Sequence, residues 1–221
     1  PLFVKDLPYR PEDLLPVLNV TRHVAVLVAA AGSPYKTLGD VVDAARRDKG
    51  GVSLATYGNS YRLGALDLAR RAGVDFNQVP YKGAAQAVAD VVGGSVDLAL
   101  IDIAGAAPLV ASGKIRALAV AGDQRHPLLP DVATVQESGY PGYTLYVFIG
   151  FAIHAKTPVA VAGKLESMMR QVMDDPALRA QLSQQSGGEV VGMGSKEFSR
   201  LIQAEAVRYG ELARLVGGAL P

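Results

Sequence analysis

The side chains and backbone groups of this 221-residue sequence that could bind a small ligand are concentrated in three short segments, each next to an apolar run. The segments cover residues 56–62, 80–85 and 101–105. Small residues in these segments leave backbone N–H groups accessible, and the N-terminus of a helix attracts negative charge. If helices begin at these segments, the chemistry they offer is the binding of an anionic group such as a carboxylate.

Each segment also has a simpler structural explanation. In the first segment Asn59, Ser60 and Arg62 supply polar contacts, although the segment could also be an ordinary strand-to-helix turn. In the second, Gly83 and the two alanines after it allow close approach of an oxyanion. In the third, Asp102 either caps a helix or accepts a hydrogen bond from a ligand hydroxyl, ammonium or bound water.

None of these segments places a nucleophile beside a base. The sequence contains no cysteine, no G-x-S-x-G or H-E-x-x-H motif and no phosphate-binding loop motif. His23, His126 and His154 lack local partners at metal-ligand spacing, so we expect them to be structural or solvated. The pattern therefore favours binding over catalysis, and we expect neither a cofactor nor a metal.

The segment Gly-Met-Gly at residues 192–194 is similar to the start of a dinucleotide-binding motif. Glu197, however, occupies the place of the third glycine, and a carboxylate there would repel a pyrophosphate. We therefore predict a turn followed by a helix, with Ser195 as its N-cap.

Composition narrows the range of partners. Hydrophobic residues make up 49% of the sequence and charged residues 19%, which is enough apolar material for a packed core. The net charge is +1, so no basic excess is present to bind a phosphate backbone, and we expect no nucleic-acid partner. The longest apolar run, residues 24–31, is far shorter than the roughly 20 residues of a membrane-spanning helix.

The elements that must position the three segments follow from hydrophobic periodicity. Short apolar runs at 24–30, 52–56, 76–80, 96–101 and 115–121 predict strands. Helices are predicted between them, at 38–48, 61–72, 84–92 and 104–112. Thr37 and Asp40 fit a capping box at the start of the first helix. This alternation is typical of an α/β fold with parallel strands, whose carboxyl ends bring the three segments to one edge of the sheet.

The two ends of the chain are predicted to form a second lobe. Four prolines indicate that residues 1–20 are an extended connection, 143–153 reads as one long strand, and 189–191 reads as a short strand. Thr157-Pro158 and Asp175-Pro176 each predict a capped helix start. Two apolar stripes indicate docked helices: Val161, Leu165, Met168, Met169, Val172, and Phe198, Leu201, Ile202, Tyr209, Leu212, Val216. We expect a continuous domain at 26–143 and a second domain at 1–25 plus 144–221.

Five phrases of the sequence resemble the tripartite tricarboxylate transporter receptors, the Bug family of periplasmic solute-binding proteins. They are Leu-Pro-Tyr-Arg-Pro-Glu-Asp-Leu at 7–14, Pro-Tyr-Lys-Gly at 80–83, Gly-Gly-Ser-Val-Asp at 93–97, Ser-Gly-Lys-Ile-Arg-Ala-Leu-Ala-Val at 112–120, and Leu-Pro-Asp-Val-Ala-Thr-Val-Gln-Glu-Ser-Gly at 129–139. The phrases occur in the family's order, and the resemblance runs over essentially the whole chain.

The resemblance implies a type II periplasmic-binding-protein-like fold with two α/β lobes joined by crossing hinge strands. It further implies hinge closure on a small carboxylate, held partly through bridging waters and passed to membrane transporter subunits. The ligand contacts it implies are Tyr57, Gly58, Asn59, Ser60 and Tyr61, then Tyr81, Gly83 and Ala84, and finally Asp102. Arg62 stands where many family members carry histidine, so it could pair directly with a ligand carboxylate.

Family members have a strand, a Gly-rich ligand loop and further helices before the Leu-Pro-Tyr phrase, and this sequence does not include them. The first lobe is therefore expected to be incomplete, and self-association of the chain is expected to follow. The resemblance places the protein in the periplasm, delivered by a signal peptide that is not part of this sequence. Two alternatives remain open here: the ligand-sensing domain of a transcription regulator with the same fold, and an α/β enzyme.

Overall fold

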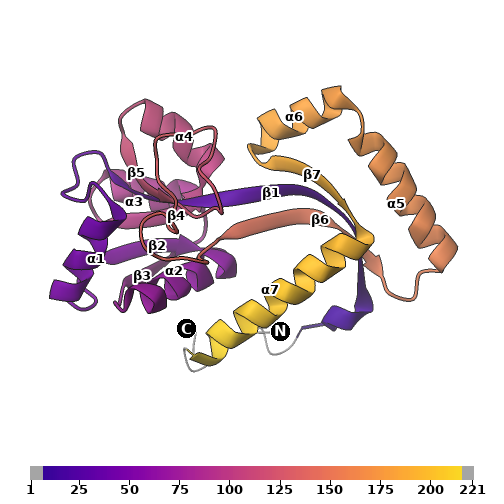
Figure 1. The fold of residues 1–221 in the computed structure, drawn as a ribbon, viewed down its shortest axis with the longest axis horizontal. Helices are drawn as coiled ribbons and strands as arrows, with labels where there is room; N and C mark the ends of the chain where they lie inside the picture. Colours follow the sequence, from indigo (N-terminus) through magenta and orange to yellow (C-terminus); the bar gives the residue numbers. More distant parts are fainter. Residues whose placement is uncertain (1–6, 216–221) are drawn as a thin grey trace. The chain divides into compact units, whose positions relative to one another are not determined.

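The chain forms two compact units (Figure 1). The computed structural model describes residues 7–215. The larger unit is Val24–Val147, and the smaller unit combines the two ends of the chain, described here over 7–23 and 148–215. The division falls within two strands, β1 (Leu14–Ala30) and β6 (Tyr146–His154), so each of these strands contributes residues to both units. The sequence had suggested a continuous domain at 26–143.

The larger unit alternates strands and helices. After β1 its elements are α1 (Leu38–Arg47), β2 (Ser53–Tyr57), α2 (Gly58–Ala72), β3 (Asn77–Tyr81), α3 (Ala84–Val92), β4 (Leu98–Asp102), α4 (Ile103–Ala111) and β5 (Ile115–Val120). The predicted helices are confirmed, although α2 begins three residues earlier than its periodicity indicated, directly after β2.

The sheet of the larger unit has the strand order β3-β2-β4-β1-β5. β2 is parallel to β3 and to β4. β1 is antiparallel to both of its neighbours, since Val26 pairs with Ile101 of β4 and with Val120 of β5. The prediction that all five strands are parallel is therefore wrong for β1. β1 enters the sheet of the larger unit at the edge where the other strands end, and so it runs in the opposite direction to them. A pattern of apolar residues does not reveal the direction of a strand.

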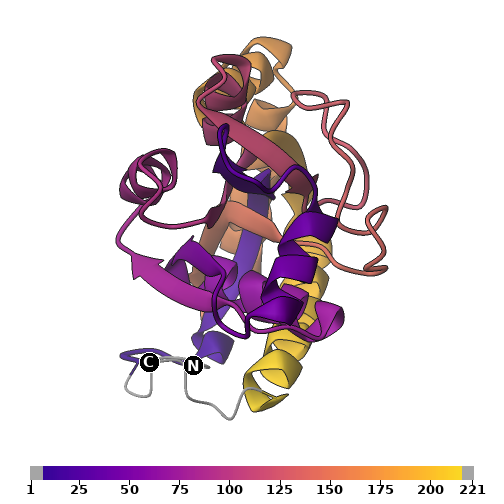
Figure 2. The same ribbon diagram turned by 90° about the vertical axis from the view of Figure 1, so that its left-hand side faces the viewer.

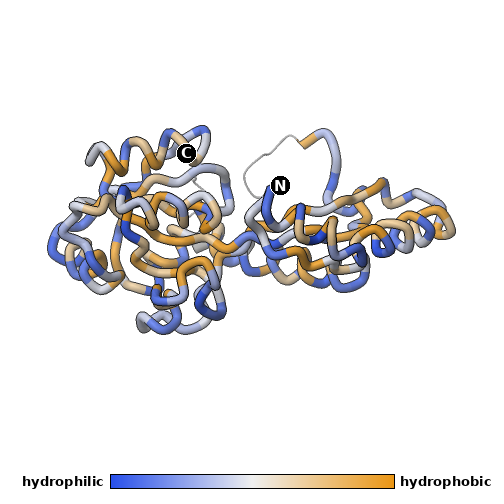
Figure 3. Tube along the Cα trace, turned by 90° about the horizontal axis from the view of Figure 1, so that it is seen from above, coloured by the Kyte–Doolittle hydropathy of each residue, from blue (hydrophilic) through white to orange (hydrophobic). Residues whose placement is uncertain are grey.

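Helices lie on both faces of this sheet (Figure 2), and an apolar layer on each face packs against them. Leu54 of β2 belongs to one layer, where it packs with residues of α1 and with Leu68 of α2. The next residue, Ala55, points to the opposite face. It belongs to the second layer, with residues of α3 and with Ile103 of α4. β2, β4 and β5 are accordingly apolar and buried along most of their length. Many of the hydrophilic residues, drawn in blue, lie at the periphery of the larger unit (Figure 3). Alternation along a buried strand thus directs successive side chains to the two faces of the sheet.

Two of the four predicted helix caps are confirmed. Thr37 caps α1 in a capping box with Asp40, whose carboxylate accepts the backbone N–H of Thr37. Asp175 caps α6 (Pro176–Ser186) by accepting the N–H of Ala177 at 2.8 Å. Thr157 does not cap α5 (Val159–Met173). Its N–H donates to the carbonyl of His154, the last residue of β6, and Pro158 is the cap residue.

In the smaller unit, the segment predicted as an extended connection forms part of a strand. Residues from Leu14 onward belong to β1, which pairs antiparallel with β7 (Glu189–Gly194) and also pairs with β6. Pro16 is compatible with this strand because it precedes the first residue paired with β7, Leu18, and its carbonyl accepts the hydroxyl of Ser195 at 2.7 Å.

The segment from Gly192 to Gly194 is not a turn but the end of β7. Gly192 has a φ of +63° and lies where the pairing with β1 shifts its register, which accounts for a glycine in a strand. Ser195 is not the cap of α7 (Ser195–Leu215) but its first residue, and its N–H donates to the carboxylate of Glu166 at 2.9 Å.

The smaller unit has few fully buried apolar residues. Val17, Leu18 and Met173 form its core, against which Leu165 and Met169 pack. Three other members of the α5 stripe are about half exposed: Val161, Met168 and Val172, at 48%, 55% and 56%. The second stripe is buried at Phe198 and Leu212, whereas Val216 lies outside the described residues. Part of each stripe is therefore exposed.

Among the described helices, none combines the length and the apolar character that crossing a membrane requires. Nor does any part of the chain between residues 7 and 215 bring together three or more histidine or acidic side chains in an arrangement that could hold a metal ion.

Candidate functional site

The three segments with ligand-binding potential meet at one edge of the larger unit's sheet. Tyr57, Tyr81 and Asp102 are the last residues of β2, β3 and β4, and these strands are neighbours. Tyr57 is paired with Tyr81 in the parallel register. α2, α3 and α4 begin one to three residues further on, so three helix N-termini lie along this edge.

The N-termini of α2 and α3 lack the side-chain caps that α1, α4 and α6 have. The N-cap residues of these two helices are Tyr57 and Gly83, neither of which makes a side-chain cap bond, and neither helix has an acidic residue in its first turn. α4 differs, because the carboxylate of Asp102 accepts the N–H of Ala104 at 2.9 Å. The first N–H groups of α2 and α3 are thus left to bind an external anion.

The glycines at these two helix starts serve different purposes. Gly58, the first residue of α2, has a φ of +67°, a conformation that strains other residues. Gly83 has an ordinary extended φ of −172°, and a side chain there would meet no atom within 4 Å. The space in front of α3 is therefore open, and the backbone does not require a glycine to keep it so.

Two stacked tyrosines support the start of α2. The rings of Tyr57 and Tyr61 lie 4.2 Å apart between centroids, and the N–H of Asp102 donates to the Tyr57 hydroxyl at 3.3 Å. Tyr61 is only 7% exposed and belongs to the core. Burial raises the pKa of both phenols, so both are neutral hydrogen-bonding groups near neutral pH. Tyr57 is the more accessible of the two, and Tyr61 acts as its support.

The remaining polar residues of the first two segments lie at or near the surface. Gly58 and Asn59 are exposed, and Ser60, Arg62, Gly83 and Ala84 are partly exposed. Arg62 forms no ion pair with any carboxylate in the described part of the chain, so its charge is available to a ligand. Lys82 is exposed.

The hydroxyl of Tyr81 is bound by α3, the helix that follows β3, and is therefore not free for a ligand. This hydroxyl donates to the carboxylate of Asp90 in α3 at 2.6 Å. This hydrogen bond, with smaller effects of burial and of the Asp90 charge, raises the pKa of Tyr81 to about 12. The Tyr81–Asp90 bond fixes α3 to the end of β3.

The Tyr81 phenol should ionise late in an alkaline titration. Because its pKa is raised from 10.0 to about 12 in the folded protein, the bond to Asp90 stabilises the fold below pH 10 and is lost between about pH 10 and 12. Ultraviolet absorbance should show one fewer late-ionising tyrosine in Tyr81→Phe. In Asp90→Asn the same phenol should ionise earlier, and an unchanged titration in that variant would contradict the assignment.

A fourth polar group at this edge is not among the residues that the sequence singled out. Asp123 follows the end of β5, and its N–H donates to the hydroxyl of Tyr146 at 3.0 Å. That hydroxyl in turn donates to the Asp123 carboxylate. The signal in the sequence is an acid just after an apolar strand, the same pattern that drew attention to Asp102.

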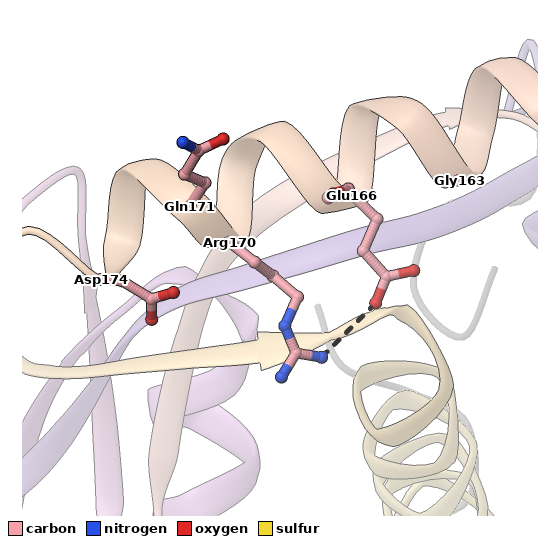
Figure 4. Close-up of a pocket in the computed structure, with 6 residues that line it drawn as sticks. Gly163, Glu166, Arg170, Gln171 and Asp174 are labelled. Atoms are coloured by element: carbon pink, nitrogen blue, oxygen red, sulfur yellow. Dashed lines mark ion pairs between the residues drawn. The ribbon is translucent and has the colours of Figure 1, made fainter.

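A groove of about 450 Å³ along α5 in the smaller unit has a structural role (Figure 4). Glu166 and Arg170 lie next to each other on α5 and are 3.8 Å apart. Glu166 already occupies the N-terminus of α7 through the N–H of Ser195. The groove therefore offers no free helix start of the kind that α2 and α3 present.

An open sheet with uncapped helix starts at the carboxyl ends of its strands is typical of ligand-binding α/β domains. The chain belongs to the tripartite tricarboxylate transporter receptor family, whose model matches residues 1–217.

Among curated proteins, the chain is 30% identical to a UPF0065 protein from the tcbD-tcbE intergenic region of Pseudomonas sp. strain P51 over 214 residues. It is 27% identical to a UPF0065 protein of Bordetella pertussis over 219 residues. These matches cover 95% and 98% of this chain but 63% and 68% of the two relatives, so the chain spans about two thirds of their length.

Solved structures with the same fold include three that are 25–27% identical to this chain. An R. palustris protein with adipate has a TM-score of 0.84, covering 96% of this chain and 72% of that one. MatC of Rhodopseudomonas palustris with bound malate gives 0.81, with coverages of 96% and 74%. The periplasmic binding protein BugD gives 0.83, with coverages of 98% and 74%. The expected α/β, type II periplasmic-binding-protein-like fold is confirmed by these matches.

Proposed function

We propose that this chain is the receptor part of a periplasmic transport system, and that it binds a small carboxylate and delivers it to membrane transporter subunits. The observation that carries the proposal is the contrast between capped and uncapped helices. α1, α4 and α6 are capped by their own side chains, whereas α2 and α3, which begin at one edge of the sheet, are not. α5 also lacks a side-chain cap, but it begins in the smaller unit and not at this edge. A ligand carboxylate would supply the acceptors missing at α2 and α3.

The proposed ligand contacts are the three clustered segments. The N–H groups of Gly58, Asn59 and Ser60 would bind one carboxylate oxygen, and those at Gly83 and Ala84 another. Tyr57 would contribute its hydroxyl, Arg62 a direct charge, and Tyr61, Tyr81 and Asp102 would hold these groups in place or contact the ligand through water.

The family and its solved members support this proposal over the alternatives. The matching family is one of receptors, and two of the structural neighbours were solved with adipate and with malate. No nucleophile–base pair is evident at the proposed site, which supports a binding role without chemical conversion of the ligand. The regulator alternative has no comparable support.

A thermal-shift assay tests the proposal. A carboxylate at a hundredfold excess over its Kd should stabilise the fold by about 2.7 kcal/mol, which corresponds to about 5–10 °C in Tm for a chain of this size. The assay should use a panel of di-, tri- and aromatic carboxylates, with the corresponding neutral amides as controls. The proposal fails if no carboxylate raises Tm above its amide.

Self-association is a further expectation for this chain on its own. Val161, Met168 and Val172 leave about half of their surface exposed on α5, and Phe151 of β6 is 54% exposed. Light scattering should detect dimers or larger species, and replacing Val161 and Met168 by serine should reduce them, unlike the control Val92→Ser in the larger unit. A monodisperse monomer would contradict the expectation.

A further inference from the structure

The Asp123–Tyr146 pair at the end of β5 forms a fixed acceptor. The hydroxyl of Tyr146 accepts from the Asp123 N–H and donates to the Asp123 carboxylate, so it binds both the backbone and the side chain of Asp123. Gly122 packs so tightly that an added Cβ would lie 3.0 Å from the Gln124 carbonyl oxygen and 3.2 Å from Val24. The direction of the Asp123 carboxylate is thus set by its surroundings, although the residue is exposed.

One oxygen of this carboxylate remains available. Oδ1 is bound by Tyr146, whereas Oδ2 has no protein partner among residues 7–215. The nearest cation along the chain, Arg125, is engaged by Glu137 through its Nε at 3.1 Å. The Asp123 charge is therefore neither neutralised nor capping a helix, unlike that of Asp102.

The carboxyl edge of the sheet consequently differs in character from one end to the other. The uncapped helix starts of α3 and α2 follow β3 and β2, which favours negative charge at that end. At the other end of the sheet, past β4 and β1, lies β5. The Asp123 carboxylate follows β5 and favours a hydrogen-bond donor or a positive charge there. β2 and β5 are three strand spacings apart, about 14 Å. The length of a four-carbon ligand, together with a hydrogen bond at each end and the length of the Asp123 side chain, is of this order.

Building on the proposed carboxylate site, we propose that Asp123, held by Tyr146, is a specificity-determining residue that selects carboxylates carrying a hydroxyl or ammonium donor at the far end. The carboxylate lies at the starts of α2 and α3, and the donor bonds to Asp123 Oδ2. A second carboxylate in the donor's place is disfavoured because it meets the like charge of Asp123.

Calorimetric titration of the wild type with 4-hydroxybutanoate, 4-aminobutanoate, butanoate and succinate tests this. The wild type should bind the two donor-bearing ligands at least about tenfold more tightly than butanoate, because a hydrogen bond to a charged group contributes that much. Asp123→Asn should abolish most of this preference and should improve the binding of succinate. Tyr146→Phe should weaken the preference while leaving butanoate binding unchanged.

Asp131→Asn is the matched control, because it removes the same charge from another exposed position in the 121–145 loop. It should leave all four affinities unchanged. If Asp123→Asn changes all four affinities equally, or none, the specificity role is wrong while the carboxylate site stands. If the wild type binds none of the four ligands or the wider panel, the proposed function falls and this inference with it.

Discussion

Gly83→Asp should make the protein more stable and at the same time lower its affinity for carboxylates by tenfold to a hundredfold. Gly83 is the N-cap position of α3 and has a φ of −172°, which aspartate adopts without strain. Aspartate at an N-cap accepts the free N–H groups, favours the helix dipole and restricts the unfolded chain, together worth about 1 kcal/mol. The new carboxylate would occupy the groups that the proposed ligand needs and would repel it.

Two further substitutions separate the causes. Gly83→Ala adds a Cβ that would meet no atom within 4 Å, so it should leave binding nearly unchanged. Gly83→Asn caps the helix without adding charge and should weaken binding less than aspartate does. Chemical denaturation and calorimetric titration measure the two effects independently. Carboxylate affinity equal to that of the wild type in Gly83→Asp would show that the start of α3 is not part of the site.

Tyr143→Ala should lower the free energy of unfolding by about 3–5 kcal/mol, the usual effect of removing a large buried aromatic side chain. Tyr143 is fully buried in the larger unit, and its hydroxyl donates to the carbonyl of Gly64 in α2 at 3.1 Å. The neighbouring Leu145 packs directly against Gly64, where an added Cβ would come within 2.4 Å of its side chain. These contacts hold α2, and with it the proposed anion-binding turn.

Tyr143→Phe is the control for the hydrogen bond, since it keeps the ring and removes only the hydroxyl. Its effect should be about 1 kcal/mol. Denaturant unfolding of the wild type and the two variants measures the series. An effect below about 1 kcal/mol for Tyr143→Ala would mean that the segment before β6 does not anchor α2.

Local signals were sufficient for the larger unit's helices and for the clustering of the candidate segments. Thr37 and Asp40 form the expected capping box, and Tyr57, Tyr81 and Asp102 end neighbouring strands as the βα alternation indicated. These features depend on residues close in sequence and on the regular geometry of parallel strands.

Features that depend on distant pairing were not predictable. β1 is antiparallel because of its partners β4, β5 and β7, far away in the sequence, and Pro16 gave a misleading signal because it lies just outside the paired stretch. The same is true of Asp123, since the partner that fixes its carboxylate, Tyr146, lies 23 residues later in the chain. Sequence patterns locate acids after strands but do not show which of them are already bound.

The net charge of +1 is compatible with a site for anions. Helix starts carry partial positive charge through their unpaired N–H groups, so a carboxylate can be bound with at most one cationic side chain. Salt should therefore affect binding less than it would at a cluster of basic residues, because groups in direct contact are screened less than separated surface charges.

The most direct test of the central claim is a carboxylate titration of the ¹⁵N-labelled protein followed by amide chemical shifts. Binding at the uncapped helix starts predicts saturable shifts for the amides of Gly58, Asn59, Ser60, Ala84 and Ala85, with little change at the capped start of α1. Shifts confined to other regions, such as the α5 groove, or their absence at the starts of α2 and α3 up to millimolar ligand, would contradict the account.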